Sequence, residues 1–138
     1  PIYTGQSDIQ NYCTAKVASN GCVPTMAATG QPNLGGPFVV SATQLINNKS
    51  GILFHGSAPA ATPFYGGLLC VAPPLRRLPA QSSGPGTNCT GTISVDFGAL
   101  THPSLALGAT TYVQCWFRDG ADPHGAGMSD GIRFTWIL

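Results

Sequence analysis

Two stretches near the C-terminal end of the chain constrain its fold more than any other part. Residues 110–118 and 131–138 are rich in β-branched and aromatic residues, and glycine and aspartate bound them, which is typical of strands joined by a turn. Apolar side chains alternate along the second stretch and share one face: Ile132, Phe134, Trp136 and Leu138. Both tryptophans lie in this region. The pattern predicts a long β-hairpin at the centre of the core.

The rest of the chain also has the pattern of a β protein. Its 18 glycines and 12 prolines favour short strands and tight turns over helices. Further strands are predicted at residues 12–17, 38–43, 52–56, 64–71 and 92–97, the last with Ile93, Val95 and Phe97 facing inward. Loops are predicted at residues 57–63 and 73–86, a bulge or sharp bend at Gly66 and Gly67, and a helical turn within residues 100–107. We therefore expect an all-β fold, an antiparallel sandwich of about eight strands that is jelly-roll or immunoglobulin-like and stapled by disulfides, with a partly open barrel as the alternative.

The length of 138 residues fits a single domain with a core of its own. Residues 1–11 contain only three sizeable apolar side chains, Ile2, Tyr3 and Ile9. We expect this segment to be an N-terminal arm or a short edge strand, and residues 12–138 to form the β-sandwich domain.

Charge is scarce along the whole chain. Only 8% of the residues are charged, glutamate is absent, and the formal net charge is +1, whereas an average soluble domain has roughly 25% charged residues. The six basic residues form no stripe that could follow a phosphate backbone, which argues against a nucleic-acid partner. No apolar run approaches the roughly 18 residues that a membrane helix needs, so we expect no membrane span.

The five cysteines indicate an oxidising compartment. Short loops that contain turn residues favour Cys13 with Cys22 and Cys70 with Cys89, although the sequence leaves the pairing open. Cys115 is then the odd cysteine, and we expect a buried thiol, with an intermolecular bridge as the alternative. We expect an extracellular or cell-surface protein, exported through a signal peptide that has already been removed.

Several blocks of the sequence resemble a known type of domain. They are Tyr12-Cys13-Thr14-Ala15-Lys16-Val17 with Gly21-Cys22, Pro63-Phe64 with Gly66-Gly67 and Leu69-Cys70-Val71, and Trp116-Phe117-Arg118-Asp119 with Ser129-Asp130-Gly131. Together they resemble an uncharacterised secreted β-domain that commonly forms the C-terminal module of large exported bacterial proteins. The resemblance implies a location outside the cell, and it implies no catalytic residues. The chain departs from that pattern at residues 135–138, where a cysteine is often found.

One glycine-rich loop contains a weak candidate for a metal site. Asp119, Asp122 and Asp130 could bind calcium through their carboxylates. Their spacing matches no EF-hand, so we favour a loop built from Asx turns and expect no metal and no other cofactor. The histidines His55, His102 and His124 could supply a hydrolase together with the five aspartates, yet no catalytic motif accompanies them. We expect no catalytic residues and no enzymatic activity.

Two groups of residues could bind a glycan. Arg76 and Arg77 could bind an anionic surface, although a solvated loop pair is the favoured interpretation. Six aromatic side chains could stack on sugar rings, with core packing as the favoured alternative: Tyr3, Tyr12, Tyr65, Tyr112, Trp116 and Trp136.

The sequence favours a structural role for the protein. Only two lysines are available to protect open sheet edges, and low net charge allows copies to associate. We expect a non-enzymatic structural subunit that builds an extracellular filament, sheath or surface layer with copies of itself. The arm, with Pro1, Ile2, Tyr3 and Thr4, is expected to contact a neighbouring subunit. The alternative is a secreted carbohydrate-binding or adhesion module.

Overall fold

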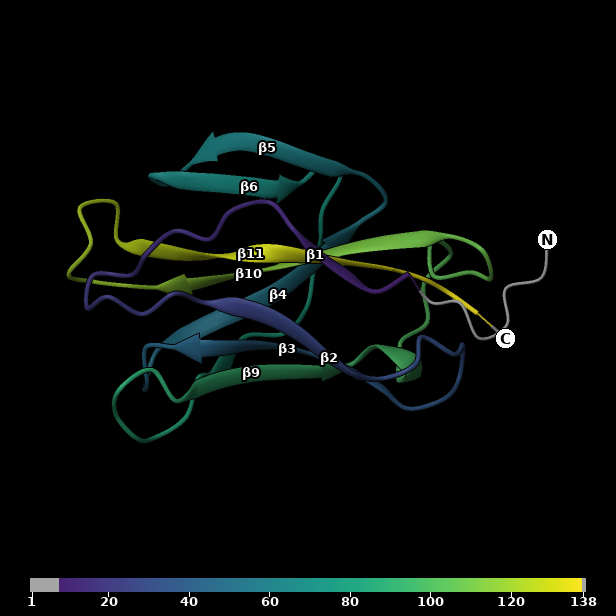
Figure 1. Cartoon of the computed structure of the whole chain (residues 1–138), viewed down its shortest axis with the longest axis horizontal. Helices are drawn as coiled ribbons and strands as arrows, with labels where there is room; N and C mark the ends of the chain where they lie inside the picture. The colour runs from purple at the N-terminus through teal and green to yellow at the C-terminus, as the bar shows by residue number, and fades with distance from the viewer. Residues whose placement is uncertain (1–7, 138) are drawn as a thin grey trace.

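The protein is a β-sandwich with a third, smaller layer (Figure 1). A computed structural model describes residues 8–137. These residues form β1 Gln10–Tyr12, β2 Thr25–Gly30, β3 Phe38–Leu45, β4 Ser50–Gly56, β5 Pro59–Phe64, β6 Gly67–Val71, β7 Arg76–Arg77, β8 Gln81–Ser82, β9 Gly91–Asp96, the 3-10 helix η1 Phe97–Ala99, β10 Thr110–Arg118 and β11 Ala126–Thr135. Every pairing between these strands is antiparallel. The predicted all-β sandwich is confirmed.

The central layer is a six-stranded sheet with the order β1-β11-β10-β4-β7, in which β8 also pairs with β4. Its longest pairing is the predicted C-terminal hairpin, which joins Thr110 to Thr135 and Arg118 to Ala126. The prediction started the second strand five residues late because it assigned Ala126 and Gly127 to the loop. Gly127 instead lies within β11 against the ring of Phe117, where a Cβ atom would collide with that ring. Packing, and not a turn, therefore requires the glycine.

The second layer is the three-stranded sheet β2-β3-β9, and the main core lies between it and the central sheet. An aromatic cluster fills this core: the ring centroid of Phe134 lies 4.8 Å from Phe38, 5.4 Å from Trp136 and 5.9 Å from Phe97. The indole of Trp136 donates a 2.9 Å hydrogen bond to the hydroxyl of Thr111. The hairpin thus supplies the centre of the core as predicted, but only one of its two tryptophans takes part.

The third layer is the hairpin β5–β6, which packs on the outer face of the central sheet (Figure 1). The prediction of a loop at residues 57–63 is wrong, because Pro59–Phe64 forms strand β5. Its prolines lie on the outer edge of the hairpin, where a missing N–H group disrupts no sheet. The bend predicted near Gly66 is present as the hairpin turn.

Residues 73–86, predicted to be irregular, contain the two short strands β7 and β8 at the edge of β4. Strand β9 matches its prediction, and Ile93 and Phe97 are buried. The predicted strand at residues 12–17 is reduced to Tyr12 at the end of β1. The helical turn expected within residues 100–107 lies earlier, in η1.

The predicted disulfide pairs are wrong, although the four cysteines were identified correctly. Cys13 is bonded to Cys70 and Cys22 to Cys89, with sequence separations of 57 and 67 residues. The segment from Cys13 to Cys22 runs beside β11, to which the amide of Lys16 donates a hydrogen bond at Met128. One bond therefore reaches the third layer, and the other reaches the loop before β9. Cys115 is a buried free thiol, as predicted, and burial raises its pKa.

The predicted N-terminal arm ends in a strand of the main sheet. Gln10–Tyr12 pairs with β11 between Gly131 and Arg133, and the guanidinium of Arg133 contacts Gln10 at 2.9 Å and Asp8 at 3.2 Å. Pro1, Ile2, Tyr3 and Thr4 lie outside the described residues, so their role in assembly stays a prediction.

Charged and polar side chains occupy several sheet edges. The edge strand β7 of the central sheet consists of the exposed residues Arg76 and Arg77. Asp130 accepts a hydrogen bond from the amide of Met26 on the outer edge of β2. Gln81 donates one to the carbonyl of Ser94 on β9. Within residues 8–137, no helix has the length and apolar character required to cross a membrane.

Candidate functional site

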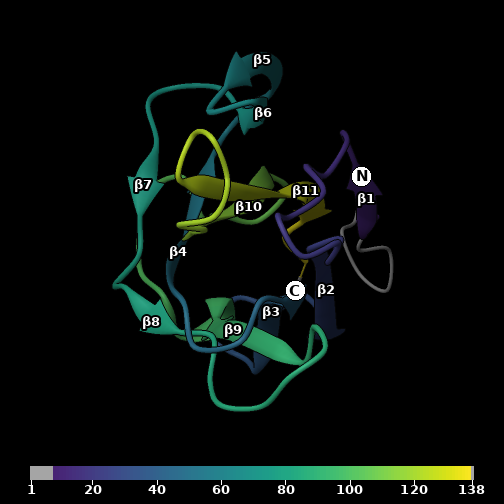
Figure 2. The same cartoon turned by 90° about the vertical axis from the view of Figure 1, so that its left-hand side faces the viewer.

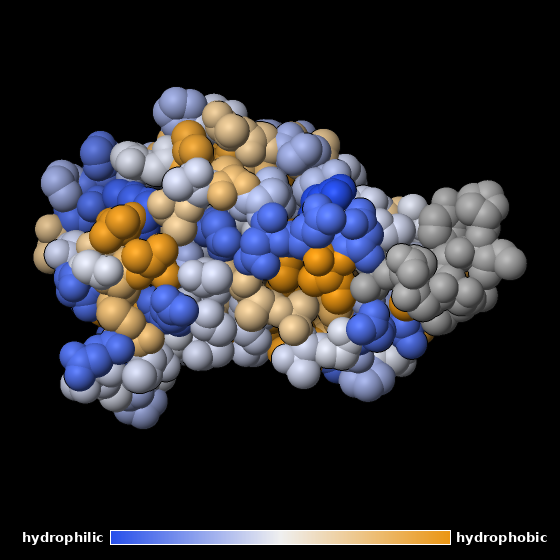
Figure 3. All heavy atoms as spheres, viewed as in Figure 1, coloured by the Kyte–Doolittle hydropathy of each residue, from blue (hydrophilic) through white to orange (hydrophobic). Residues whose placement is uncertain are grey.

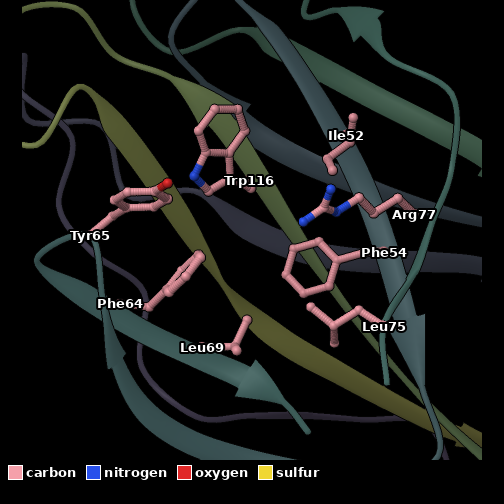
Figure 4. Close-up of a pocket in the computed structure, with 8 residues that line it drawn as sticks. All are labelled: Ile52, Phe54, Phe64, Tyr65, Leu69, Leu75, Arg77 and Trp116. Carbon is pink, nitrogen blue, oxygen red and sulfur yellow. The ribbon is translucent and has the colours of Figure 1, made fainter. Parts of the chain in front are cut away.

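A groove of about 240 Å³ lies between the hairpin β5–β6 and the outer face of the central sheet. Figure 2 shows this hairpin above the sheet, with the chain running from it to β7 at the sheet's side. Side chains of alternate residues in β4 and β10 form the floor, and the hairpin and the β7 region form the walls (Figure 4). The groove is lined by Ile52, Phe54, Phe64, Tyr65, Leu69, Leu75, Arg77 and Trp116.

Three aromatic side chains meet at one end of this groove. Trp116 on β10 lies directly opposite Ile52 of β4. The ring of Tyr65 lies 6.1 Å from that of Trp116 and 4.4 Å from that of Phe64. Phe64 and Tyr65 are 38% and 47% exposed, whereas the other five phenylalanines and Trp136 are buried. A cluster of exposed aromatic rings is a feature of binding surfaces.

The turn of the hairpin places the ring of Tyr65. Tyr65 and Gly66 have φ angles of 50° and 77°, as a two-residue type I′ turn requires. Asparagine and glycine normally occupy such positions, so a tyrosine there carries backbone strain. A Cβ atom on Gly66 would also lie 2.7 Å from Nδ1 of His124, so the exposed side chain of His124 would have to move. The strained turn thus holds an aromatic ring at the groove.

A buried lysine fixes the tip of the hairpin. The ammonium of Lys16 donates hydrogen bonds to the carbonyl oxygens of Tyr65 at 2.6 Å and Ala126 at 2.9 Å, and to the carboxylate of Asp122 at 2.7 Å. The Lys16 and Asp122 side chains are only 11% and 8% exposed. The hydrogen bond from Lys16 lowers the pKa of Asp122 below its usual value. The tip is therefore fastened to the loop between β10 and β11.

The far end of the hairpin is fastened around Cys70. Its disulfide reaches Cys13, and its carbonyl oxygen accepts a 2.6 Å hydrogen bond from the hydroxyl of Tyr12, whose pKa is raised mainly by burial. The buried amide of Gln114 accepts a hydrogen bond from the Cys70 N–H at 2.8 Å and donates one to the carbonyl of Leu68 at 2.9 Å. With both ends held, the groove is preformed.

Two arginines lie beside Trp116. The guanidinium of Arg77 points into the groove (Figure 4). That of Arg118 lies 5.5 Å from the centroid of the Trp116 ring, a cation–π distance. The indole nitrogen of Trp116 is buried and has no hydrogen-bond partner within the described residues. The groove therefore combines apolar rings with positive charge.

The structure does not bring the calcium candidates together. Asp119 accepts hydrogen bonds from the amide and hydroxyl of Ser19, and Asp130 accepts one from the amide of Met26. Asp122 is paired with Lys16 and accepts a hydrogen bond from the amide of His124, an Asx turn. No group of three or more potential metal ligands occurs within residues 8–137. The three carboxylates instead fasten separate segments of the chain.

The three histidines also lie in different surroundings. His55 and His102 line a second hollow of about 160 Å³ with Arg76 and Ser104, and their rings lie 5.7 Å apart. His55 is buried, its Nδ1 atom lacks a partner within residues 8–137, and its pKa is lowered to about 4, first by burial and then by His102 and Arg76. His124 lies at the hairpin tip. None of the residues that line this hollow carries a carboxylate.

The sequence identified part of the groove. Tyr65 and Trp116 were among the six aromatic candidates, while Tyr12, Tyr112 and Trp136 pack in the structure, and Tyr3 lies outside the described residues. Of the two arginines, Arg77 lines the groove and Arg76 faces the second hollow. Phe64 and Arg118 were missed. The signal for Phe64 was its position beside Tyr65 and two glycines, which is the composition of a hairpin tip with aromatic residues.

Comparison with known proteins adds no family to this description. No protein-family model matches the chain, and no curated protein matches it. The resemblance to a secreted C-terminal domain stays a prediction, and the geometry of the groove is the basis for a functional proposal.

Proposed function

We propose that the protein is a non-enzymatic extracellular module that binds a carbohydrate chain in the groove between β5–β6 and the central sheet. The observation that carries the proposal is the aromatic cluster in which exposed Phe64 and Tyr65 meet half-buried Trp116. Flat aromatic faces pack on the apolar faces of pyranose rings while the sugar hydroxyls remain in water.

The rigidity of the groove supports this proposal. Lys16 holds one end of the hairpin, and the Cys13–Cys70 disulfide and Gln114 hold the other. A preformed site avoids the entropy cost of ordering a loop when a ligand binds. The two disulfides also suit an oxidising, extracellular location.

The lining of the groove supports binding over catalysis. None of the lining residues is an acid, a histidine, a serine or a cysteine. General acid–base hydrolysis of a glycosidic bond requires two carboxyl groups beside the bond, and the groove offers none. The polar side-chain groups of this lining are Arg77, the hydroxyl of Tyr65 and the indole N–H of Trp116.

The proposal is tested by screening the protein on an array of purified polysaccharides and oligosaccharides. Trp116→Ala and Tyr65→Ala are expected to weaken binding at least about tenfold each. Val23→Ala, which removes an exposed apolar side chain outside the groove, is the matched control. An array with no binding above background, or binding that survives both groove substitutions in folded protein, would contradict the proposal.

A second candidate function, a subunit of an extracellular assembly, is favoured by where the other exposed apolar residues lie. Val17 and Val23 are 59% and 44% exposed in the loop between β1 and β2, and Leu34 and Leu107 are 44% and 46% exposed. In Figure 1 the loop with the valines lies at the left end of the long axis, and the loops with the leucines lie at the right end. Figure 3 shows a hydrophobic patch over the loop between β1 and β2. Apolar contacts at opposite ends suit head-to-tail stacking, which generates filaments.

Light scattering and electron microscopy test the assembly candidate. Val17→Asp is expected to reduce or abolish any polymer, while Thr14→Asp adds the same charge to an exposed position in the same loop and is expected to leave it intact. A monodisperse 14.2 kDa species at high concentration would contradict assembly.

A further inference from the structure

All five aspartate side chains of the chain are engaged by other groups, and none of them lines the groove. Asp8 contacts Arg133, and Asp122 contacts Lys16. The remaining three accept hydrogen bonds from backbone amides: Asp96 from Phe38, Asp119 from Ser19, and Asp130 from Met26. Because the chain contains no glutamate, no acidic side chain is left to neutralise a cation at the groove.

Two cations lie at the groove. Arg77 lines it, and Arg118 lies over the ring of Trp116. Both are exposed, and neither has an ion-pair partner within residues 8–137. Arg76 also lacks an ion-pair partner within residues 8–137, but its side chain lines the second hollow and not the groove. The aromatic end of the groove therefore carries uncompensated positive charge from two different strands.

We propose that the ligand of the groove is an acidic carbohydrate, an inference that rests on the proposed function. One of its sugar rings packs against Tyr65 and Trp116. A carboxylate of the same ligand binds Arg77 or Arg118. The planar guanidinium presents parallel N–H donors that match the two oxygens of a carboxylate. A uronic acid carries this carboxylate on the pyranose ring itself. One residue of such a polymer thus contacts an aromatic ring and a guanidinium together.

The magnitude of the charge effect follows from the exposure of the arginines. Exposed ion pairs are weak and are screened by salt. Each arginine is therefore expected to improve binding of the acidic ligand by about twofold to fivefold. Affinity is expected to fall as the salt concentration rises from 20 mM to 500 mM, while stacking on the aromatic rings is retained.

The experiment compares two forms of one polymer by titration calorimetry. Oligogalacturonides are the acidic probe, and the same oligosaccharides with methyl-esterified carboxyl groups are the neutral probe. Esterification removes the charge and leaves the ring and its hydroxyl groups in place. Arg77→Gln and Arg118→Gln are expected to lower the ratio of acidic to neutral affinity about twofold to fivefold each, and the matched control Arg76→Gln is expected to preserve it.

The outcomes separate this inference from the proposed function. Equal affinity for both probes, with binding lost in Trp116→Ala, overturns the acidic specificity and leaves carbohydrate binding intact. No binding of either probe, together with an array without neutral binders, overturns both. Polyglutamate, which has carboxylates but no sugar rings, is added as a charge control. Binding of polyglutamate as tight as that of the oligogalacturonide would show that charge alone is recognised, and would overturn the inference.

Discussion

The ammonium of Lys16 lies 2.6 Å from the carbonyl oxygen of Tyr65, forty-nine residues further along the chain. Through this bond the segment after β1 holds the tip of the hairpin β5–β6. The same ammonium binds Asp122 and the carbonyl of Ala126 in the loop between β10 and β11. One side chain therefore joins three segments that are distant in sequence and fixes the position of an aromatic ring at the groove.

Replacing this lysine is expected to loosen the hairpin tip. In Lys16→Met the alkyl stem is retained, but the carbonyl groups of Tyr65 and Ala126 lose a charged donor, which costs about 1–3 kcal/mol. The free energy of unfolding, measured by urea denaturation, is expected to fall by this amount. Lys49→Met is the control, because Lys49 has no ion pair within residues 8–137. Equal effects of the two substitutions would show that Lys16 has no special role.

The stability conferred by Asp122 is expected to depend on pH. Its pKa is lowered in the folded state by the hydrogen bond from Lys16, so its contribution is present above the unfolded pKa of about 4 and is lost as pH falls through the folded value. Asp122→Asn is therefore expected to lower Tm at pH 7 and to reduce the further loss of Tm below pH 4. Asp130 acts in the opposite direction, since burial raises its pKa. For this reason the quantity to follow is the difference in Tm between wild type and Asp122→Asn at each pH. A difference in Tm that stays constant with pH would refute this prediction.

His55 is expected to destabilise the protein in mild acid. Its pKa is about 4 in the fold, mainly because it is buried, whereas the unfolded value is about 6.5. The stability that His55 contributes is complete above about pH 6.5 and is lost as pH falls toward 4. The reason is that His55 is protonated at a higher pH in the unfolded chain than in the folded protein. The full difference between the folded and unfolded pKa values corresponds to about 3 kcal/mol of unfolding free energy. Solvent in the adjoining hollow reduces this contribution to about 2 kcal/mol.

The measurement is urea denaturation of wild type and His55→Gln at pH 7 and pH 4.5. The variant is expected to lose less stability between these two pH values. His124→Gln, which changes an exposed histidine, is expected to follow wild type. The same loss of unfolding free energy in all three proteins would show that another titrating group governs stability between pH 4.5 and pH 7.

The disulfide connectivity is open to a direct check by tryptic peptide mapping without reduction. Cleavage after the basic residues separates the bonded cysteines, because Cys13 falls in residues 1–16, Cys22 in 17–49, Cys70 in 50–76 and Cys89 in 78–118. The structure requires 1–16 to be joined to 50–76, and 17–49 to 78–118. A joined pair of 1–16 and 17–49 would contradict it.

The two disulfides are expected to contribute similarly to stability. They close loops of 57 and 67 residues, and the chain-entropy model assigns about 4 kcal/mol to each. Replacing Cys13 and Cys70 together by serine is expected to lower the free energy of unfolding by about this amount. Cys115→Ala, which changes only the buried free thiol, is the control.

The sequence predicted well those parts of the fold that follow from a local pattern. The alternation in residues 92–97 and the apolar runs of the C-terminal hairpin were sufficient to place β9, β10 and the second half of β11. Strand β6 lies within the strand predicted at residues 64–71. Its partner β5 was missed, because Pro59 and Pro63 are poor strand residues that only a free edge tolerates.

The disulfides and the groove depend on contacts between distant residues. Cys13 lies near Cys22 in sequence, but the strands carry it to Cys70. Likewise, Trp116 had the pattern of a core residue, and only the side of the sheet it occupies shows that it faces the groove. The alternation of side chains along a strand defines two faces of the sheet. It does not indicate which of these faces borders a groove beneath a further layer.

The position of β11 within the central sheet has a consequence for how the molecule is made. This strand lies between β1 and β10. The first strand of the described chain, β1, therefore cannot pair until the last strand, β11, is available. A chain that emerges from the ribosome or crosses a membrane from its N-terminal end therefore cannot complete this sheet until residues 126–135 arrive. The high sequence separation of these contacts predicts slow folding.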